Sequence, residues 1–196
     1  MALSKTSVVD TALELLQESG LAGMSMRTLA TRIGVQPSAL YWHIPSKQAL
    51  LTAVAERVLA TVRSRGGGGS TGGDSAGGGS SAGGGGSASA ELRSIGEGLR
   101  AAVAGVPDGA EIVALGLAAG AVNPVVAAVE EVCARHGLAE RAPGLAAVVT
   151  GYVIGLGLEE QTHHNLRVAD PELAEIDFGP RFAAGLDALL AGVEGE

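Results

Sequence analysis

The sequence is poor in cysteine and aromatic residues, and it lacks the common catalytic motifs. Cys133 is the only cysteine among 196 residues, so no intramolecular disulfide can form, and we expect a reducing, cytoplasmic location. The N-terminus lacks the apolar core of a signal peptide. Aromatic residues make up only 3% of the chain. No Ser/His/Asp order, phosphate-binding glycine loop or paired-carboxylate pattern stands out, so we expect neither an enzyme nor a cofactor-binding protein.

Positive charge is scarce overall but unevenly distributed. The net charge is −8, yet residues 1–65 hold seven basic against four acidic residues, which gives +3. The remaining residues hold six basic against seventeen acidic, which gives −11. A basic N-terminal region joined to an acidic one indicates that any nucleic-acid contact is made by the N-terminal region.

Residues 66–90 contain almost nothing but glycine, serine and alanine. Such a composition predicts a flexible linker without helix or strand. It divides the chain into a small N-terminal region, 1–65, and a helical C-terminal region, 91–196. The irregular spacing of its glycines favours natural sequence drift over an engineered joint, although both origins stay open.

A helix-turn-helix pattern lies within the basic region. Met26, Leu29, Ala30 and Ile33 recur at helical spacing, and Gly34 can end that helix. Pro37 suits the first position of a second helix, over 37–43, which is too short to be stable alone. Helices over 5–19 and 47–64 flank the pair. We therefore expect a three-helix head followed by a longer connecting helix.

The short helix carries small residues first and hydrogen-bonding aromatic residues after them. Tyr41 and Trp42 are adjacent, so they cannot share one helical face. They could be core aromatics of the head, but at least one should be exposed. We favour contact with phosphates and base edges in a DNA major groove.

The stretch MSMRTLATRIGV-PSALYWHIPSKQALL resembles the DNA-binding end of the TetR family of repressors, closest to the tetracycline-repressor branch. The LYWH run followed by Lys47 is its most specific part, and fainter likeness returns in VIGLGLEEQTHH and FAAGLDALLAG. The resemblance implies an all-α repressor that binds a palindromic double-stranded operator as a homodimer and is released by a small molecule. The residues that it assigns to DNA contact are Arg27, Pro37, Ser38, Ala39, Tyr41, Trp42, His43 and Lys47.

The C-terminal region reads as helices over 91–104, 110–120, 124–136, 143–168 and 180–193. Ala147, Gly151 and Gly155 recur every four residues along the long helix, with Gly144 before them and Gly157 after. Glycine inside a helix costs about 0.5–1 kcal/mol relative to alanine, so a close approach of another backbone is expected. The resemblance implies that this ridge and the last helix form a four-helix dimer interface. The last helix would contribute Phe182, Leu186, Leu189 and Leu190.

A small apolar effector is expected to bind in the C-terminal region. The residues assigned to its pocket are Ile112, Val113, Leu117, Val125, Val129, Ile154, Glu159 and His163. Val113 stands where tetracycline repressors place a metal-binding histidine, which argues against a metal–tetracycline chelate. Glu159 with His163 gives only two ligands on one helical face, and a closed zinc site needs four. A polar helix end is therefore favoured over a metal site.

A membrane-associated helical protein is the alternative function. Residues 112–129 and 142–158 carry no formal charge, and each is near the length of a membrane span. However, Asn123-Pro124 interrupts the first stretch, and no basic cluster fixes an orientation. We expect a ligand-responsive repressor with no membrane partner.

Overall fold

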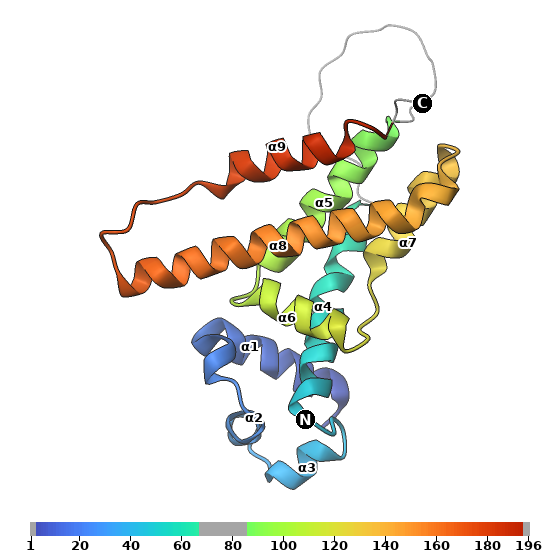
Figure 1. The fold of residues 1–196 in the computed structure, drawn as a ribbon. Helices are drawn as coiled ribbons and strands as arrows, with labels where there is room; N and C mark the ends of the chain where they lie inside the picture. The colour runs from blue at the N-terminus through green and yellow to red at the C-terminus, as the bar shows by residue number, and fades with distance from the viewer. Residues whose placement is uncertain (1–2, 67–85, 194–196) are drawn as a thin grey trace, which may run out of the picture.

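The structure, a computed structural model, describes residues 3–66 and 86–193. Residues 67–85, most of the expected linker, lie outside the described residues. Within the described residues every regular element is a helix, so the predicted all-α class is confirmed. Figure 1 shows a small group of helices near the N-terminus at one end and a larger group of helices at the other. We call these parts the head and the body.

The head is built from α1 (Lys5–Gly23), α2 (Met26–Ile33), α3 (Pro37–Tyr41) and the start of α4 (Lys47–Gly66). Its core contains the fully buried Leu16, Leu29 and Leu40. Ser25 caps α2, because its Oγ accepts a hydrogen bond of 3.0 Å from the Thr28 amide. Gly34 ends α2 in the left-handed conformation, with φ of 81°. Local sequence chemistry therefore sets both ends of α2.

Two helix ends in the head differ from the sequence prediction. Gly20 has φ of 62° and interrupts α1, but a further helical turn follows and extends the element to Gly23. The second helix of the pair ends at Tyr41 instead of residue 43. The chain turns there because the amides of His43 and Ile44 both donate to the Leu40 carbonyl oxygen.

Helix α4 runs from the head into the body and belongs to both. In the head it packs against α1. In the body it packs against α6 (Gly109–Ala118), and this contact is more extensive than that between any other two described helices. The two helices touch at Gly116, where an added Cβ would overlap the Cβ of Ala55. Val62, near the other end of α4, lies against Gly98 of α5 (Ala88–Ala104). Residues 66 and 88–90, expected in the linker, are helical.

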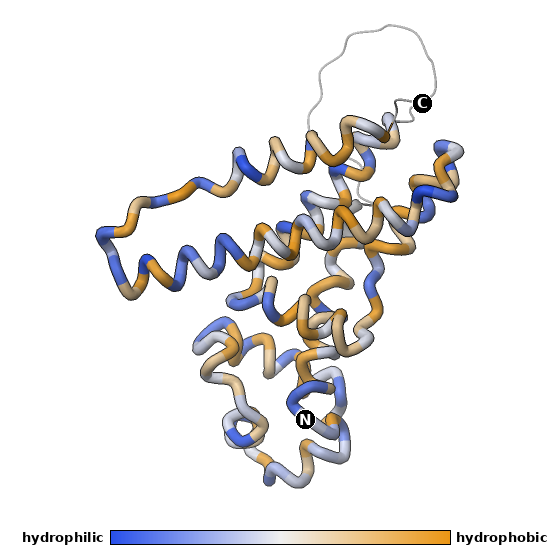
Figure 2. Tube along the Cα trace, viewed as in Figure 1, coloured by the Kyte–Doolittle hydropathy of each residue, from blue (hydrophilic) through white to orange (hydrophobic). Residues whose placement is uncertain are grey.

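The body contains α5, α6, α7 (Pro124–Arg135), the short 3-10 helix η1 (Ala139–Arg141), α8 (Ala142–Ala169) and α9 (Phe178–Leu190). Asn123 caps α7, since its Oδ1 accepts from the Val125 amide at 3.1 Å. One face of the N-terminal half of α8 is buried in the body through apolar residues, whereas the C-terminal half is mostly polar and extends outward to the loop before α9 (Figures 1 and 2).

The described residues do not form a membrane hairpin, that is, two membrane-length helices over the uncharged stretches 112–129 and 142–158. Its first half, residues 112–129, is divided between α6, a loop and α7. Among the described residues, one continuous helix, Ala139–Ala169, is long and apolar enough to cross a membrane. One face of that helix packs in the body core through Leu145, Val149 and Val153. A buried core helix has the same length and composition.

Candidate DNA-binding face and body cavity

Helix α3 has one fully buried side chain and presents most of its other side chains to solvent. Leu40 is fully buried, whereas Tyr41 is 48% exposed and Trp42 is 89% exposed. Pro37, Ser38 and His43 are exposed and Ala39 is half-buried. The alternative in which Tyr41 and Trp42 fill the head core is therefore wrong.

Two exposed cations flank α3. Arg27 lies in the first turn of α2 and Lys47 at the start of α4, and neither forms an ion pair with another residue that the structure describes. The neighbouring Arg32 differs, because it pairs with Glu18 of α1, and this pair lowers the pKa of the Glu18 carboxyl. Arg27 and Lys47 thus keep their charge available for an external anion.

A cavity of about 800 Å³ lies where the head meets the body. The end of α1, α5, the turn before α6, α8 and α9 all contribute to its wall. Its apolar part includes Val103, Ala110, Val153, Leu156 and Phe182. Its polar part includes Gln17, Ser19, Arg100, Asp108, Glu160, Gln161, His164 and Asn165.

Arg100 joins three helices on one side of this cavity. Its guanidinium donates to both carboxylate oxygens of Glu160 on α8, at 3.2 and 3.3 Å. It also donates to the Phe178 carbonyl oxygen at 3.3 Å and lies 4.7 Å from the centre of the Phe182 ring on α9. Arg100 therefore links α5, α8 and α9.

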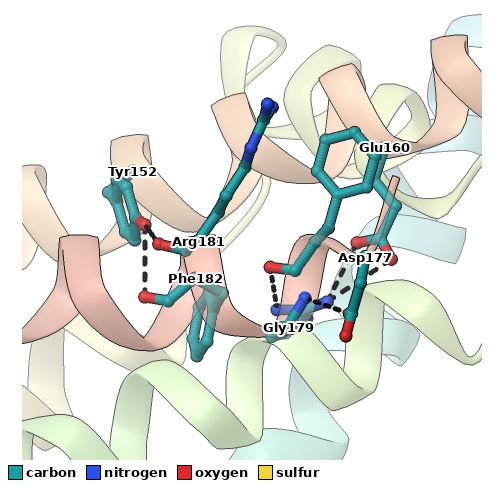
Figure 3. A network of polar contacts seen from close by, with 8 residues as sticks. Tyr152, Glu160, Asp177, Gly179, Arg181 and Phe182 are labelled. Carbon is teal, nitrogen blue, oxygen red and sulfur yellow. Dashed lines mark hydrogen bonds and ion pairs between the residues drawn. The ribbon is translucent and has the colours of Figure 1, made fainter. Parts of the chain in front are cut away.

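A second set of contacts holds α9 against α8 (Figure 3). The Tyr152 hydroxyl donates to the carbonyl oxygens of Arg181 and Phe182, at 2.9 and 3.2 Å. Asp177 caps the start of α9, because its Oδ1 accepts from the Gly179 amide at 2.9 Å. These contacts hold the start of α9 in place, and with it Phe182, whose side chain lines the cavity.

Asp108 connects the head to the body across the cavity wall. Its Oδ2 accepts a 2.6 Å hydrogen bond from the Leu21 amide, just after the break in α1. Its Oδ1 accepts a 3.0 Å bond from Gln161 Nε2 on α8. Asp108 adopts the left-handed conformation, with φ of 57°, the only positive φ among the non-glycine residues described. Gln17 of α1 adds a parallel link by donating to the Gly105 carbonyl at 2.9 Å.

The residues that the sequence assigned to the effector pocket do not line this cavity. Ile112, Val113, Val125 and Val129 are fully buried, and Ile154 is nearly so, because helices pack closely around them. Leu117 is half-buried and packs against the same core. These side chains fill the interior instead of bordering this cavity, and their contact with an effector stays a prediction.

Glu159 and His163 also lie outside the cavity wall. Glu159 pairs with Arg181 of α9 at 3.0 Å, and the His163 ring lies 5.7 Å from that of Phe178. No group of three or more potential metal ligands occurs among residues 3–66 and 86–193. Sequence reasoning missed Glu160, Gln161, His164 and Asn165, although their i, i+1, i+4, i+5 spacing marks one polar face of α8.

The geometry defines an all-α protein with a helix-turn-helix head and a body that holds a ligand-sized cavity. Residues 8–54 match the family model "Bacterial regulatory proteins, tetR family". The chain is 48% identical over 58 residues to the class D tetracycline repressor protein of Escherichia coli. That match covers 30% of this chain and only 27% of the repressor's own length.

Solved structures extend the likeness to the whole chain. A single-residue variant of TetR from Acinetobacter baumannii AYE, in complex with minocycline, is 32% identical with a TM-score of 0.73, covering 98% of this chain and 93% of that one. BioQ with its natural double-stranded DNA operator is 27% identical with a TM-score of 0.73, and the match covers 100% of both chains. This chain belongs to the TetR family.

Proposed function

We propose that the protein is a cytoplasmic, ligand-responsive transcriptional repressor that binds a palindromic operator as a homodimer. The exposed surface of α3 carries this proposal, because a single buried anchor, Leu40, leaves its other residues available for a groove. The complexes formed by similar proteins support it, since BioQ was solved with its DNA operator and the Acinetobacter TetR variant with minocycline.

The residues of the proposed DNA-binding face fall into three groups by their proposed role. Pro37, Ser38 and Ala39 are small enough to let the backbone approach the bases. Tyr41, Trp42 and His43 supply polar tips that can hydrogen-bond to phosphates and base edges. Arg27 and Lys47 neutralise phosphates.

Lys47→Ala tests this face. Loss of one phosphate contact per subunit should weaken binding to all DNA sequences alike and lower the salt slope by about one per contact. The measurement is binding to DNA that flanks the protein's own gene, at several salt concentrations. Arg167→Ala, which removes a cation from the far end of α8, is the control and should change neither quantity. Unchanged affinity and slope for Lys47→Ala would contradict the phosphate role.

The homodimer is proposed from the outer surface of α8 and α9. Cβ atoms added at Gly144, Gly151 and Gly155 would have nothing within 4 Å, so this ridge faces outward from the protomer. Ala184 and Ala188 give α9 a similar exposed surface of small residues. Small residues on both helices suit a close approach of four helices around a two-fold axis.

The expected contribution of the last helix changes in one respect. Phe182, Leu186 and Leu190 are buried within the protomer, where Leu186 packs against Gly96 of α5. Leu189, which is 39% exposed, is the only one of the four predicted residues that is free to face a partner. The apolar stripe of α9 thus closes the body, and its small-residue side remains for the dimer.

Gly151→Leu tests the dimer. The larger side chain should hold the two copies apart and raise the dimer dissociation constant, measured by sedimentation at low protein concentration. Ala60→Leu places the same side chain on an exposed part of α4, away from this ridge, and should leave the dimer intact. An undisturbed dimer in Gly151→Leu would contradict the proposed interface.

The effector is proposed to occupy the cavity at the head–body junction. Its volume lies within the range typical of small-molecule sites, about 300–1,000 Å³. The mixture of apolar and polar lining residues favours an amphipathic effector over the purely apolar one expected from the sequence. The link from cavity to head runs through Asp108 and through the packing of α6 on α4.

A further inference from the structure

We infer that Asp108 selects effectors carrying a protonated amine, and that binding of such an amine releases the head from the body. This inference rests on the proposed function, because it concerns the cavity in which we place the effector. It assigns a chemical class to the effector and a role to one carboxylate.

The charges around the cavity leave Asp108 as the uncompensated group. Arg100 and Glu160 form an ion pair and cancel each other. Among the residues that the structure describes, no cation pairs with Asp108, whose two recorded partners are a backbone amide and a glutamine amide. The polar side chains that α1 adds to the cavity, Gln17 and Ser19, are neutral, and α9 adds Phe182. His164 and Asn165 on α8 complete the polar lining.

The ligand chemistry follows from these surroundings. A carboxylate has about four lone-pair positions, so Asp108 can accept further donors beyond its present two. A charged donor forms a stronger hydrogen bond with a carboxylate than either neutral amide does. Val103, Leu156 and Phe182 provide an apolar surface for the rest of the molecule. The site is therefore complementary to an amphipathic ammonium ion.

The same carboxylate also controls the contact with the head. Leu21 follows the break at Gly20, and its amide donates to Asp108 instead of to a helical carbonyl. Packing is tight there, since a Cβ added to Gly20 would lie 2.8 Å from Asp108 Oδ2. An ammonium that draws Oδ2 into the cavity leaves the Leu21 amide without this acceptor. A ligand that binds more tightly to the protein without the Leu21–Asp108 bond shifts the population toward that conformation, and operator affinity falls.

Three anthracene derivatives with similar shapes test the selectivity. Fluorescence titration of the full chain compares 9-anthracenemethylamine with 9-anthracenemethanol and anthracene-9-carboxylate. A hydrogen bond to a charged group predicts binding of the amine about tenfold or more tighter than the alcohol, with the carboxylate weakest. Equal affinity of the wild-type protein for amine and alcohol would overturn the inference.

Variants of Asp108 show whether this residue is the source of the selectivity. Asp108→Asn keeps a hydrogen-bond acceptor and a residue that tolerates positive φ, so the backbone turn is retained. Asp108→Gly removes the side chain at a backbone conformation that glycine adopts freely. Both should bind amine and alcohol alike. Glu111→Gln, a loss of one negative charge on the exposed side of α6, should keep the preference. Amine preference that persists in both Asp108 variants would overturn the inference.

Operator binding supplies the second measurement. The amine should lower the operator affinity of the wild-type protein and of Glu111→Gln, and it should have no effect on Asp108→Asn. Equal release of wild type and Asp108→Asn would contradict the role of Asp108 in control. Failure of the wild-type protein to bind any DNA would contradict the repressor function, whereas the fluorescence titration would still decide the amine selectivity.

Discussion

The head and the body are both helical, but different kinds of contact determine their functional surfaces. In the head, the α2 cap joins residues three positions apart, and α3 is placed by Leu40 and the turn that follows it. By contrast, Asp108 of the body bonds to Leu21 of the head across 87 positions, and Arg100 contacts Phe178 within the body across 78. The proposed DNA-binding face thus depends on contacts between residues close in the chain, and the proposed effector cavity depends on packing between distant segments.

Leu40→Ala should produce the largest difference between the two regions. The change leaves α3 without its buried anchor and should lower the free energy of unfolding by about 2–5 kcal/mol. Leu99→Ala removes the same atoms from the body core, where Leu99 is also fully buried. Both variants should lose similar stability in urea unfolding, but only Leu40→Ala should lose operator binding under conditions where both remain folded. Equal operator binding by the two would contradict the view that Leu40 positions α3.

Gly116→Ala should have the next largest effect, at the junction of the two regions. The added methyl group would overlap Ala55 and push α6 away from α4. This should lower the free energy of unfolding by about 1–3 kcal/mol. Gly98→Ala makes the same change in α5, where the nearest atom, Val62 Cγ1, would be 3.7 Å away. The Gly98 variant should be unchanged or more stable by about 0.5–1 kcal/mol, because alanine favours helix. Thermal unfolding of the pair checks this, and equal melting temperatures would contradict the close approach at Gly116.

The sequence predicted the head well because its signals act over a few residues. Gly34 ends α2 and Pro37 begins α3 as expected, and Ser25 caps α2 from the position just before it. A local cap also acts in the body, where Asn123 precedes α7. An exposed aromatic residue could be expected because Trp42 follows Tyr41 directly, and two adjacent residues point in different directions from a helix.

The cavity could not be located from the sequence for the opposite reason. Its wall is formed by segments distant in the chain, and a run of valines and isoleucines reads alike whether it fills a core or borders a space. Val113 and Val129 proved to be core residues. Asp108 carries no local signal of its contact with the head, because Leu21 lies 87 positions away in the chain.

Glu91→Gln should have the smallest effect, and it is confined to the body. Hydrogen bonds from Arg135 and then His136 lower the pKa of Glu91 in the folded protein and join α5 to the end of α7. A lowered folded-state pKa stabilises the fold above the unfolded-state pKa, and this contribution is lost as the pH falls through the folded-state value. Glu91→Gln should therefore lower the free energy of unfolding by about 1 kcal/mol or less at neutral pH and leave it unchanged in strong acid.

Urea unfolding across a pH series measures this difference. Glu97→Gln alters an exposed carboxyl of the same helix and is the matched control, with no expected change at either pH. A Glu91→Gln deficit that stays constant into strong acid would show that packing, and not the charge of Glu91, joins the two helices.

The single anchor of α3 has a consequence for how such a protein diverges. Because Leu40 is the only fully buried residue of this helix, exchanging its exposed residues removes no buried contact, and most exposed substitutions change stability by less than about 0.5 kcal/mol. Mutation can therefore sample new sequences at positions 37, 38 and 41–43 without passing through unfolded intermediates. Target preference and folding can drift independently, so a lineage can retain the scaffold while the DNA sequence that it recognises changes.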